Sequence, residues 1–171
     1  SFAGQFESFL GIATEADFLT AVRGCWTSLW STRALRYLRT HQMDPAGTAM
    51  AVLVQRLVEA RAAGGALSQT ADGGLLLTGT WGLGSAVAQG EVVPDRYLLG
   101  RDGSLREVEP GRKDRRVTCT PEAGAVPEAV AAELIEAPCL SPAQAVELGR
   151  LVLTLESLLG TPVEVEWALG A

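Results

Sequence analysis

The sequence contains few of the residues that build disulfide frameworks and metal clusters. Its 171 residues include three cysteines, Cys25, Cys119 and Cys139, and a single histidine, His41. An odd number of dispersed cysteines predicts neither a set of disulfides nor a zinc site. We therefore expect reduced thiols and a cytoplasmic protein. We interpret His41 as an exposed residue in the turn after a helix, rather than as a ligand or a base.

Long apolar runs and an excess of positive charge are also missing. No uninterrupted apolar stretch approaches the roughly 20 residues that a membrane helix needs, so we expect a soluble protein without a membrane partner. The chain carries 20 acidic and 14 basic residues, with a net charge of −6 and a pI near 4.8. Because nucleic-acid binding depends on neutralising phosphates, this balance argues against a nucleic-acid partner. A nucleotide remains possible, since it needs only a few local donors and a metal ion.

The composition that is present belongs to an ordinary globular protein. Hydrophobic residues make up 47% of the chain and charged residues 20%, which argues against disorder. The length allows one compact core or two small lobes. Helical spacing of apolar residues after Thr14 predicts either one long helix or two shorter helices with a break near Ser31 and Thr32. We interpret the basic residues that follow the break as a solvated stripe: Arg33, Arg36 and Arg39.

A second helix is predicted near the C-terminus. Ser141 suits its N-cap, Pro142 its first position and Gln144 the third position of a capping box, while Gly160 suits its end. Strands are predicted over residues 49–60 (AMAVLVQRLVEA, buried), from 64, over 75–81, over 92–100 and over 163–169. Helices and antiparallel hairpins are mixed without a βαβ rhythm, so we predict the α+β class.

Two stretches could bind a nucleotide. In SFAGQFES, Gly4 allows a close approach of the backbone to an anion, and Gln5 and Ser8 add donors. In VLVQRLV, Gln55 offers an amide at the end of a buried strand, and a purine edge could pair with it. The alternatives are an ordinary polar turn and a plain core strand.

Two further stretches carry other polar groups. A short helix that begins near Ser85, after two glycines, could face an anion. In VEVEWALG, Glu164 and Glu166 project from the same strand face, and such carboxylates suit Mg²⁺ bound to phosphates. The alternative for these acids is a solvated strand face.

The order of these segments carries more information than any one of them. SFAGQ, VLVQRLV, TWGLGSAVAQGEVVPDRY, PCLSPAQAVELGRL and VEVEWA follow one another through nearly all 171 residues. In this order they resemble the nucleotide-binding domain of the phosphoenolpyruvate synthase and pyruvate phosphate dikinase family, which rifampin phosphotransferase shares. The resemblance implies an ATP-grasp fold, with ATP between two α+β lobes. It also implies ATP and Mg²⁺ as cofactors and a histidine, on a separate swivelling domain, that receives the phosphoryl group.

The resemblance also implies roles for particular residues. Gly4 and Ser8 fall in the family's phosphate-binding loop, with Gln5 between them. Gln55 falls on the strand that leads to the adenine hinge. Glu166 matches the acidic residue that holds Mg²⁺. The residues expected beside the base are Leu57 and Val58, whereas Lys113 receives no role.

Departures from the family pattern lead us to expect a partial domain. The family's phosphate-contacting lysine and arginine precede its SFAGQ-like turn, and its metal-binding glutamine follows its EWA-like segment. Ser85 stands where the family usually has glutamate, the hairpin at LSQTADGG is shorter and more polar, and His41 does not match the swivelling histidine. We therefore predict a partial ATP-grasp domain over residues 1–171, with a phosphate loop and helical segment over 1–48 and a sheet-containing lobe over 49–171.

This partial domain is expected to hold no catalytic residue and to be inactive by itself. Three alternatives remain. One is a degenerate nucleotide-binding or structural module, a second is a related enzyme whose acceptor is a rifampin-type antibiotic, and the third is an unrelated α+β domain.

Overall fold

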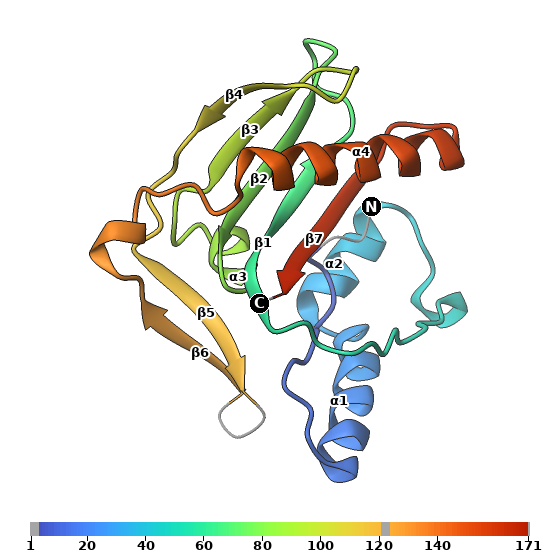
Figure 1. The fold of residues 1–171 in the computed structure, drawn as a ribbon. Coiled ribbons are helices and arrows are strands. Elements are labelled where there is room, and N and C mark those ends of the chain that lie inside the picture. Colours follow the sequence, from blue (N-terminus) through green and yellow to red (C-terminus); the bar gives the residue numbers. More distant parts are fainter. Residues whose placement is uncertain (1–3, 121–123, 171) are drawn as a thin grey trace. The chain divides into compact units, whose positions relative to one another are not determined.

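A computed structural model describes residues 4–120 and 124–170 of the chain (Figure 1). The chain forms two compact units. The first contains the described residues up to Leu57 together with Thr120 and 124–125, and the second contains Val58–Cys119 and 126–170. No helix among the described residues is both long and apolar enough to cross a lipid bilayer.

The first unit is built on two helices. Helix α1 spans Glu15–Ser28, helix α2 spans Thr32–Thr40, and a 3₁₀ turn, η1, spans Pro45–Gly47. The Thr14 hydroxyl accepts a hydrogen bond from the Asp17 amide at 3.2 Å and caps α1. Ser31 caps α2 in the same way through the Ala34 amide. Of the two predicted alternatives, two helices with a break near Ser31 are therefore confirmed, because each helix has its own N-cap.

The strand predicted over residues 49–60 is wrong. No helix or strand lies between η1 and strand β1, which spans Ala60–Leu67. Leu53 and Val54 are 83% and 61% exposed, so this apolar run is not buried. The strand forms further along the chain, where small residues permit close pairing: at Gly64 a Cβ atom would collide with the backbone carbonyl of Thr78. Gly64 therefore lies in the middle of β1 instead of at the start of a separate strand.

The second unit contains a five-stranded antiparallel sheet in the order β4-β3-β2-β1-β7 (Figure 1). Strand β2 spans Leu75–Trp81, β3 spans Asp95–Leu99, β4 spans Leu105–Glu109 and β7 spans Glu164–Gly170. Strands β5, Arg115–Thr120, and β6, Gly124–Ala129, form a separate two-stranded sheet. The short elements are α3, Ser85–Ala88, and the 3₁₀ turn η2, Ala132–Leu134. The predicted α+β class is confirmed.

Helix α4, Pro142–Leu159, covers one face of the five-stranded sheet (Figure 1). Its N-terminus has the predicted capping box between Ser141 and Gln144, and it ends at Gly160 with φ +68°. The hydrophobic core lies between this helix and the sheet. Fully buried members of this core include Ala62, Leu75, Leu77, Tyr97, Leu99 and Val152.

The opposite face of the sheet, which we call the open face, takes the alternate residues of each strand. On β7, Glu164 and Glu166 are exposed while Val165 and Trp167 are half-buried, which confirms the predicted alternation. Across β1 and β2, the residues on the open face include Ala63, Gly65, Leu67, Leu76, Thr78 and Thr80, of which Ala63 and Thr80 are buried.

Candidate functional site

Two carboxylates define the candidate metal site on the open face. Glu164 lies opposite Leu67 and Glu166 lies opposite Gly65 in the β1–β7 ladder. Both side chains are exposed, and neither forms an ion pair within the described part of the chain. Residues two apart on a strand point the same way, roughly 7 Å apart, so both carboxylates remain available to a ligand.

Small residues surround Glu166 on this face. Gly65 lies opposite it, and the neighbouring pair across the same two strands is Ala63 and Ala168. The Thr78 hydroxyl contacts the Gly65 backbone at 3.3 Å, both to its amide nitrogen and to its carbonyl oxygen. The surface beside Glu166 is therefore formed mainly by backbone and methyl groups.

This donor set fits Mg²⁺. The ion prefers oxygen ligands and is usually held by one or two carboxylates, with phosphates and waters completing its shell. Glu164 and Glu166 supply carboxylates of that kind. Nowhere in residues 4–120 and 124–170 do three His, Cys, Asp or Glu side chains gather as a metal site.

The predicted phosphate loop lies in the first unit. Gly4 has φ +69°, and no atom lies within 4 Å of the position a Cβ would occupy. The Arg33 guanidinium donates to the Gln5 carbonyl at 3.3 Å and pairs with the Glu7 carboxylate at 2.9 Å. Arg33, which is exposed as the interpretation of a solvated stripe expects, therefore also holds this loop against α2. Ser8 is exposed.

The residues expected beside the adenine base lie outside any strand. Gln55, Leu57 and Val58 are all exposed. Gln55 and Leu57 belong to the first unit, as do Gly4, Gln5 and Ser8, whereas Val58 and Glu166 belong to the second. Within the second unit, a Cγ atom of Val58 would lie 3.8 Å from a Cβ placed on Gly170, so Val58 packs beside the end of β7.

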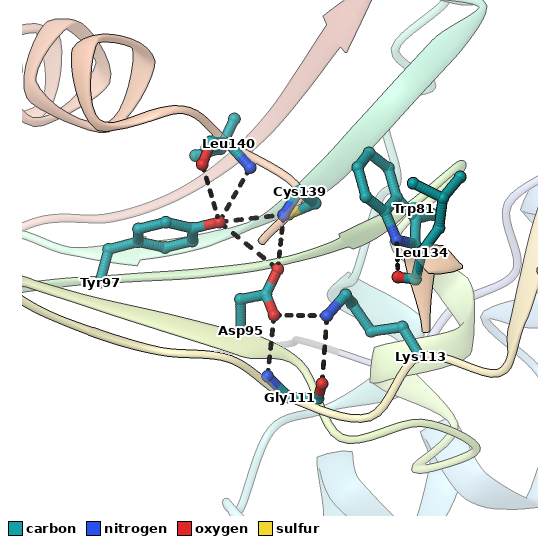
Figure 2. Close-up of polar contacts among 8 residues, drawn as sticks. All are labelled: Trp81, Asp95, Tyr97, Gly111, Lys113, Leu134, Cys139 and Leu140. Carbon is teal, nitrogen blue, oxygen red and sulfur yellow. Dashed lines mark hydrogen bonds and ion pairs between the residues drawn. The ribbon is translucent and has the colours of Figure 1, made fainter. Parts of the chain in front are cut away.

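A buried polar cluster on the α4 side of the sheet was not predicted from the sequence. We call it the Asp95 cluster; Figure 2 shows its members, which are Asp95, Tyr97, Gly111, Lys113, Cys139 and Leu140. The side chains of Asp95 and Lys113 form an ion pair and are both fully buried. The Asp95 carboxylate also accepts hydrogen bonds from the amides of Gly111 at 2.8 Å and Cys139 at 2.7 Å.

Tyr97 and Cys139 remain neutral in this cluster. Burial is the main cause that raises the pKa of Tyr97 well above its ordinary value. Burial, reinforced by the nearby charge of Asp95, raises the pKa of Cys139 to about 12. A thiol with so high a pKa is not a nucleophile near neutral pH. Since Asp95 pairs with Gly79 on the helix-covered face, the cluster does not reach the open face.

The glycine-rich turn after β2 contacts both β1 and β5. Gly82 has φ +69° and donates its amide to the Arg61 carbonyl at 2.9 Å, and Leu83 donates to the Val117 carbonyl of β5 at 2.8 Å. Helix α3 follows directly. The hydroxyls of Thr80 and Ser85 are buried and have no hydrogen-bond partner within the described residues. Ser85 begins α3, as predicted.

These features are those of an α+β domain with two exposed carboxylates on one face of its sheet. Residues 1–171 match the family model described as pyruvate phosphate dikinase, AMP/ATP-binding domain. The chain therefore belongs to this family, and the resemblance inferred from segment order is confirmed.

Several relatives match nearly the whole chain. Phosphoenolpyruvate synthase of Aeropyrum pernix is 31% identical over 99% of this chain and 24% of that protein. A probable phosphoenolpyruvate synthase of Methanothermobacter thermautotrophicus is 36% identical over 99% and 25%. Rifampicin phosphotransferase of Streptomyces sviceus is 32% identical over 99% and 20%. The chain thus spans between a fifth and a quarter of the length of these relatives.

Proposed function

We propose that this chain is the ATP-binding part of a phosphotransferase that phosphorylates a histidine on a separate swivelling domain. The observation that carries this proposal is the match of residues 1–171 to an AMP/ATP-binding domain of the dikinase family. We infer further that the chain forms part of an ATP-grasp domain, with residues 1–48 as its phosphate-loop segment and 49–171 as its sheet-containing lobe. Similarity to two phosphoenolpyruvate synthases favours that activity for the whole protein.

Glu166 would hold Mg²⁺, and Glu164 stands on the same strand face to assist it. When bound, Mg²⁺ supplies positive charge that stabilises the phosphates during transfer. Gly4, Gln5 and Ser8 would contact phosphate oxygens, whereas the Glu7 amide of the same loop donates to the Ser28 hydroxyl at 3.1 Å. Gln55, Leu57 and Val58 would contact the base. These residues bind and orient ATP, whereas the nucleophile lies on another domain.

A variant of the metal carboxylate tests this proposal. In the full-length protein, Glu166→Gln should weaken Mg-ATP binding at least about tenfold and lower phosphoryl transfer by orders of magnitude. Isothermal titration calorimetry and a transfer assay measure the two effects. Glu107→Gln is the matched control, because Glu107 is an exposed carboxylate on the open face at the far edge of the sheet. Equal behaviour of the two variants would contradict the proposed metal site.

A degenerate nucleotide-binding or structural module is the second candidate. The position where the family usually has glutamate is occupied by Ser85, whose hydroxyl is buried without a partner in the described residues. Such a module would bind Mg-ATP, or nothing, and would transfer no phosphoryl group. In that case Glu166→Gln would leave every transfer assay at the same background as the unaltered protein. A rifampin-type acceptor is distinguished by assaying transfer to the antibiotic, as the name of one relative suggests.

A further inference from the structure

The Asp95 cluster joins the start of β3 to two connections that are distant in sequence. Gly111 and Lys113 lie in the connection between β4 and β5, and Cys139 lies just before α4. Besides its ion pair with Asp95, the Lys113 side chain donates to the Gly111 carbonyl at 3.2 Å, and its backbone amide donates to the Ile135 carbonyl at 2.9 Å. Lys113 is the single lysine of the chain, and it is fully buried.

The chemistry of the cluster explains why it needs a carboxylate. The two oxygens of Asp95 face four donors, which are the amides of Gly111 and Cys139, the ammonium of Lys113 and the hydroxyl of Tyr97 (Figure 2). An asparagine would turn an NH₂ group towards one of those donors, since only an ionised carboxylate accepts on both sides. A buried ion pair is seldom retained for stability alone, because an apolar replacement is often as stable. The ion pair between Asp95 and Lys113 therefore suggests a role in positioning the segments that it joins.

A continuous path leads from the cluster to the turn beside the open face. From Lys113 the chain enters β5, where the Val117 carbonyl accepts the Leu83 amide. Gly82 pairs with Val117 in an isolated bridge, and a Cβ on Gly82 would collide with that carbonyl. A Cβ on Gly84 would lie 3.9 Å from the Gly64 amide nitrogen in β1. Strand β1 in turn pairs with β7, which carries Glu166.

We propose that Asp95 and Lys113 are positioning residues for nucleotide binding, because they fix β5 and thereby the Gly82–Gly84 turn beside the open face. This inference rests on the proposed function. Neither side chain touches the ligand. By linkage, a ligand that requires the ordered turn must also stabilise the ion pair. Loss of the ion pair must then lower the affinity for that ligand. A purely structural pair would show no such reciprocity.

The buried lysine is itself the reporter for the first test. An amine-acylating reagent can reach Lys113 only when the cluster opens, and peptide mass spectrometry reads the modification at that residue. At about 100 times its Kd, Mg-ATP should slow acylation by about 100-fold if it binds only the closed form. Amide exchange in the β2–β3 ladder, measured in the same sample, separates this local effect from general stabilisation. Acylation that slows no more than the exchange of that ladder would overturn the proposal.

Variants provide the second test, with tryptophan indoles as internal probes. The Trp81 indole donates to the Leu134 carbonyl at 2.8 Å, next to the turn, whereas the exposed Trp26 indole belongs to α1 of the first unit. Lys113→Met should shift the Trp81 indole and Leu83 amide signals in ¹⁵N NMR spectra, leave the Trp26 indole in place, and raise the Kd of Mg-ATP at least tenfold. Asp95→Asn/Lys113→Met, which removes both charges, should do the same.

The matched control removes the ion pair between Arg96 and Glu109, which is exposed and joins β3 to β4. Arg96→Gln/Glu109→Gln should change neither the Trp81 signal nor the Kd. A folded Lys113→Met protein with unaltered affinity would overturn the proposal, as would an unaltered Leu83 amide. If the variants do not fold, the acylation test decides. If unaltered protein binds no Mg-ATP, the proposed function fails, while the NMR comparison still tests whether the ion pair fixes the turn.

Discussion

At the scale of single residues, Gly64 shows how one missing side chain permits the sheet to form. A Cβ at this position would collide with the backbone carbonyl of Thr78, which cannot move away as a flexible side chain could. We expect Gly64→Ala to lower the free energy of unfolding by about 3 kcal/mol or more. Urea unfolding followed by circular dichroism measures this change.

Gly47→Ala is the control for that substitution. Gly47 has no atom within 4 Å of a Cβ position, and its φ lies outside the left-handed region. This variant should change the free energy of unfolding by no more than about 0.5 kcal/mol. A Gly64→Ala protein as stable as the Gly47→Ala protein would mean that β1 and β2 are not paired as described.

Individual residues also show what the sequence could and could not reveal. The alternation of Glu164 and Glu166 with Val165 and Trp167 was predictable, because a strand places every second residue on the same face. The ion pair between Asp95 and Lys113 was not, since its members lie 18 positions apart. Their contact depends on how the connections around Gly111 and Cys139 return to β3, and no local pattern encodes this. A lone lysine and an aspartate within an apolar stretch were the available signals.

At the scale of elements, local chemistry predicted helices better than strands. The caps at Thr14, Ser31 and Ser141 each satisfy backbone amides within a few residues, so helix starts could be inferred from sequence alone. Residues 49–60 are richer in apolar side chains than the true strand β1. A strand needs pairing partners from distant segments, however, and in the second unit β1 has β2 and β7. Long-range pairing therefore overrode the local pattern.

An ion pair near the end of α4 predicts how stability depends on pH. The Arg101 guanidinium pairs with both oxygens of Glu156, at 2.8 and 2.7 Å, and holds the pKa of that carboxyl to about 2. Since this pKa is lowered in the folded state, the stabilisation is present above the ordinary pKa near 4.5 and is lost as pH falls towards 2. The Tm of Glu156→Gln should accordingly depend less on pH in this range than the Tm of the unaltered protein.

Thermal unfolding followed by circular dichroism at a series of pH values measures this difference. Glu147→Gln is the control, because Glu147 is exposed on the same helix and forms no ion pair in the described residues. Its Tm should follow that of the unaltered protein as the pH falls. Parallel curves for all three proteins would show that Arg101 and Glu156 do not interact in solution.

At the scale of the whole molecule, the main point is that this chain corresponds to only one part of its longer relatives. The chain matches an AMP/ATP-binding domain along its whole length yet spans only 19–25% of the relatives it matches. The family could be inferred from the sequence because several separated motifs occur along the chain in the same order as in the family. The order of these motifs could not place Gln55 or Glu166 relative to each other, since they belong to different compact units. The proposed site therefore depends on binding experiments with the intact protein.

The last prediction concerns where the phosphoryl group goes. His41, the single histidine of this chain, stacks against Tyr37 with ring centroids 4.2 Å apart, in the turn after α2. We expect ATP labelled at its β- and γ-phosphates to transfer label to a histidine of the full-length protein outside residues 1–171. The 171-residue chain alone should acquire none. Gel autoradiography before and after acid treatment measures this, because phosphohistidine is acid-labile. Full-length His41→Ala should be labelled as strongly as the unaltered protein, and loss of label in that variant would make His41 the acceptor and refute a separate swivelling domain.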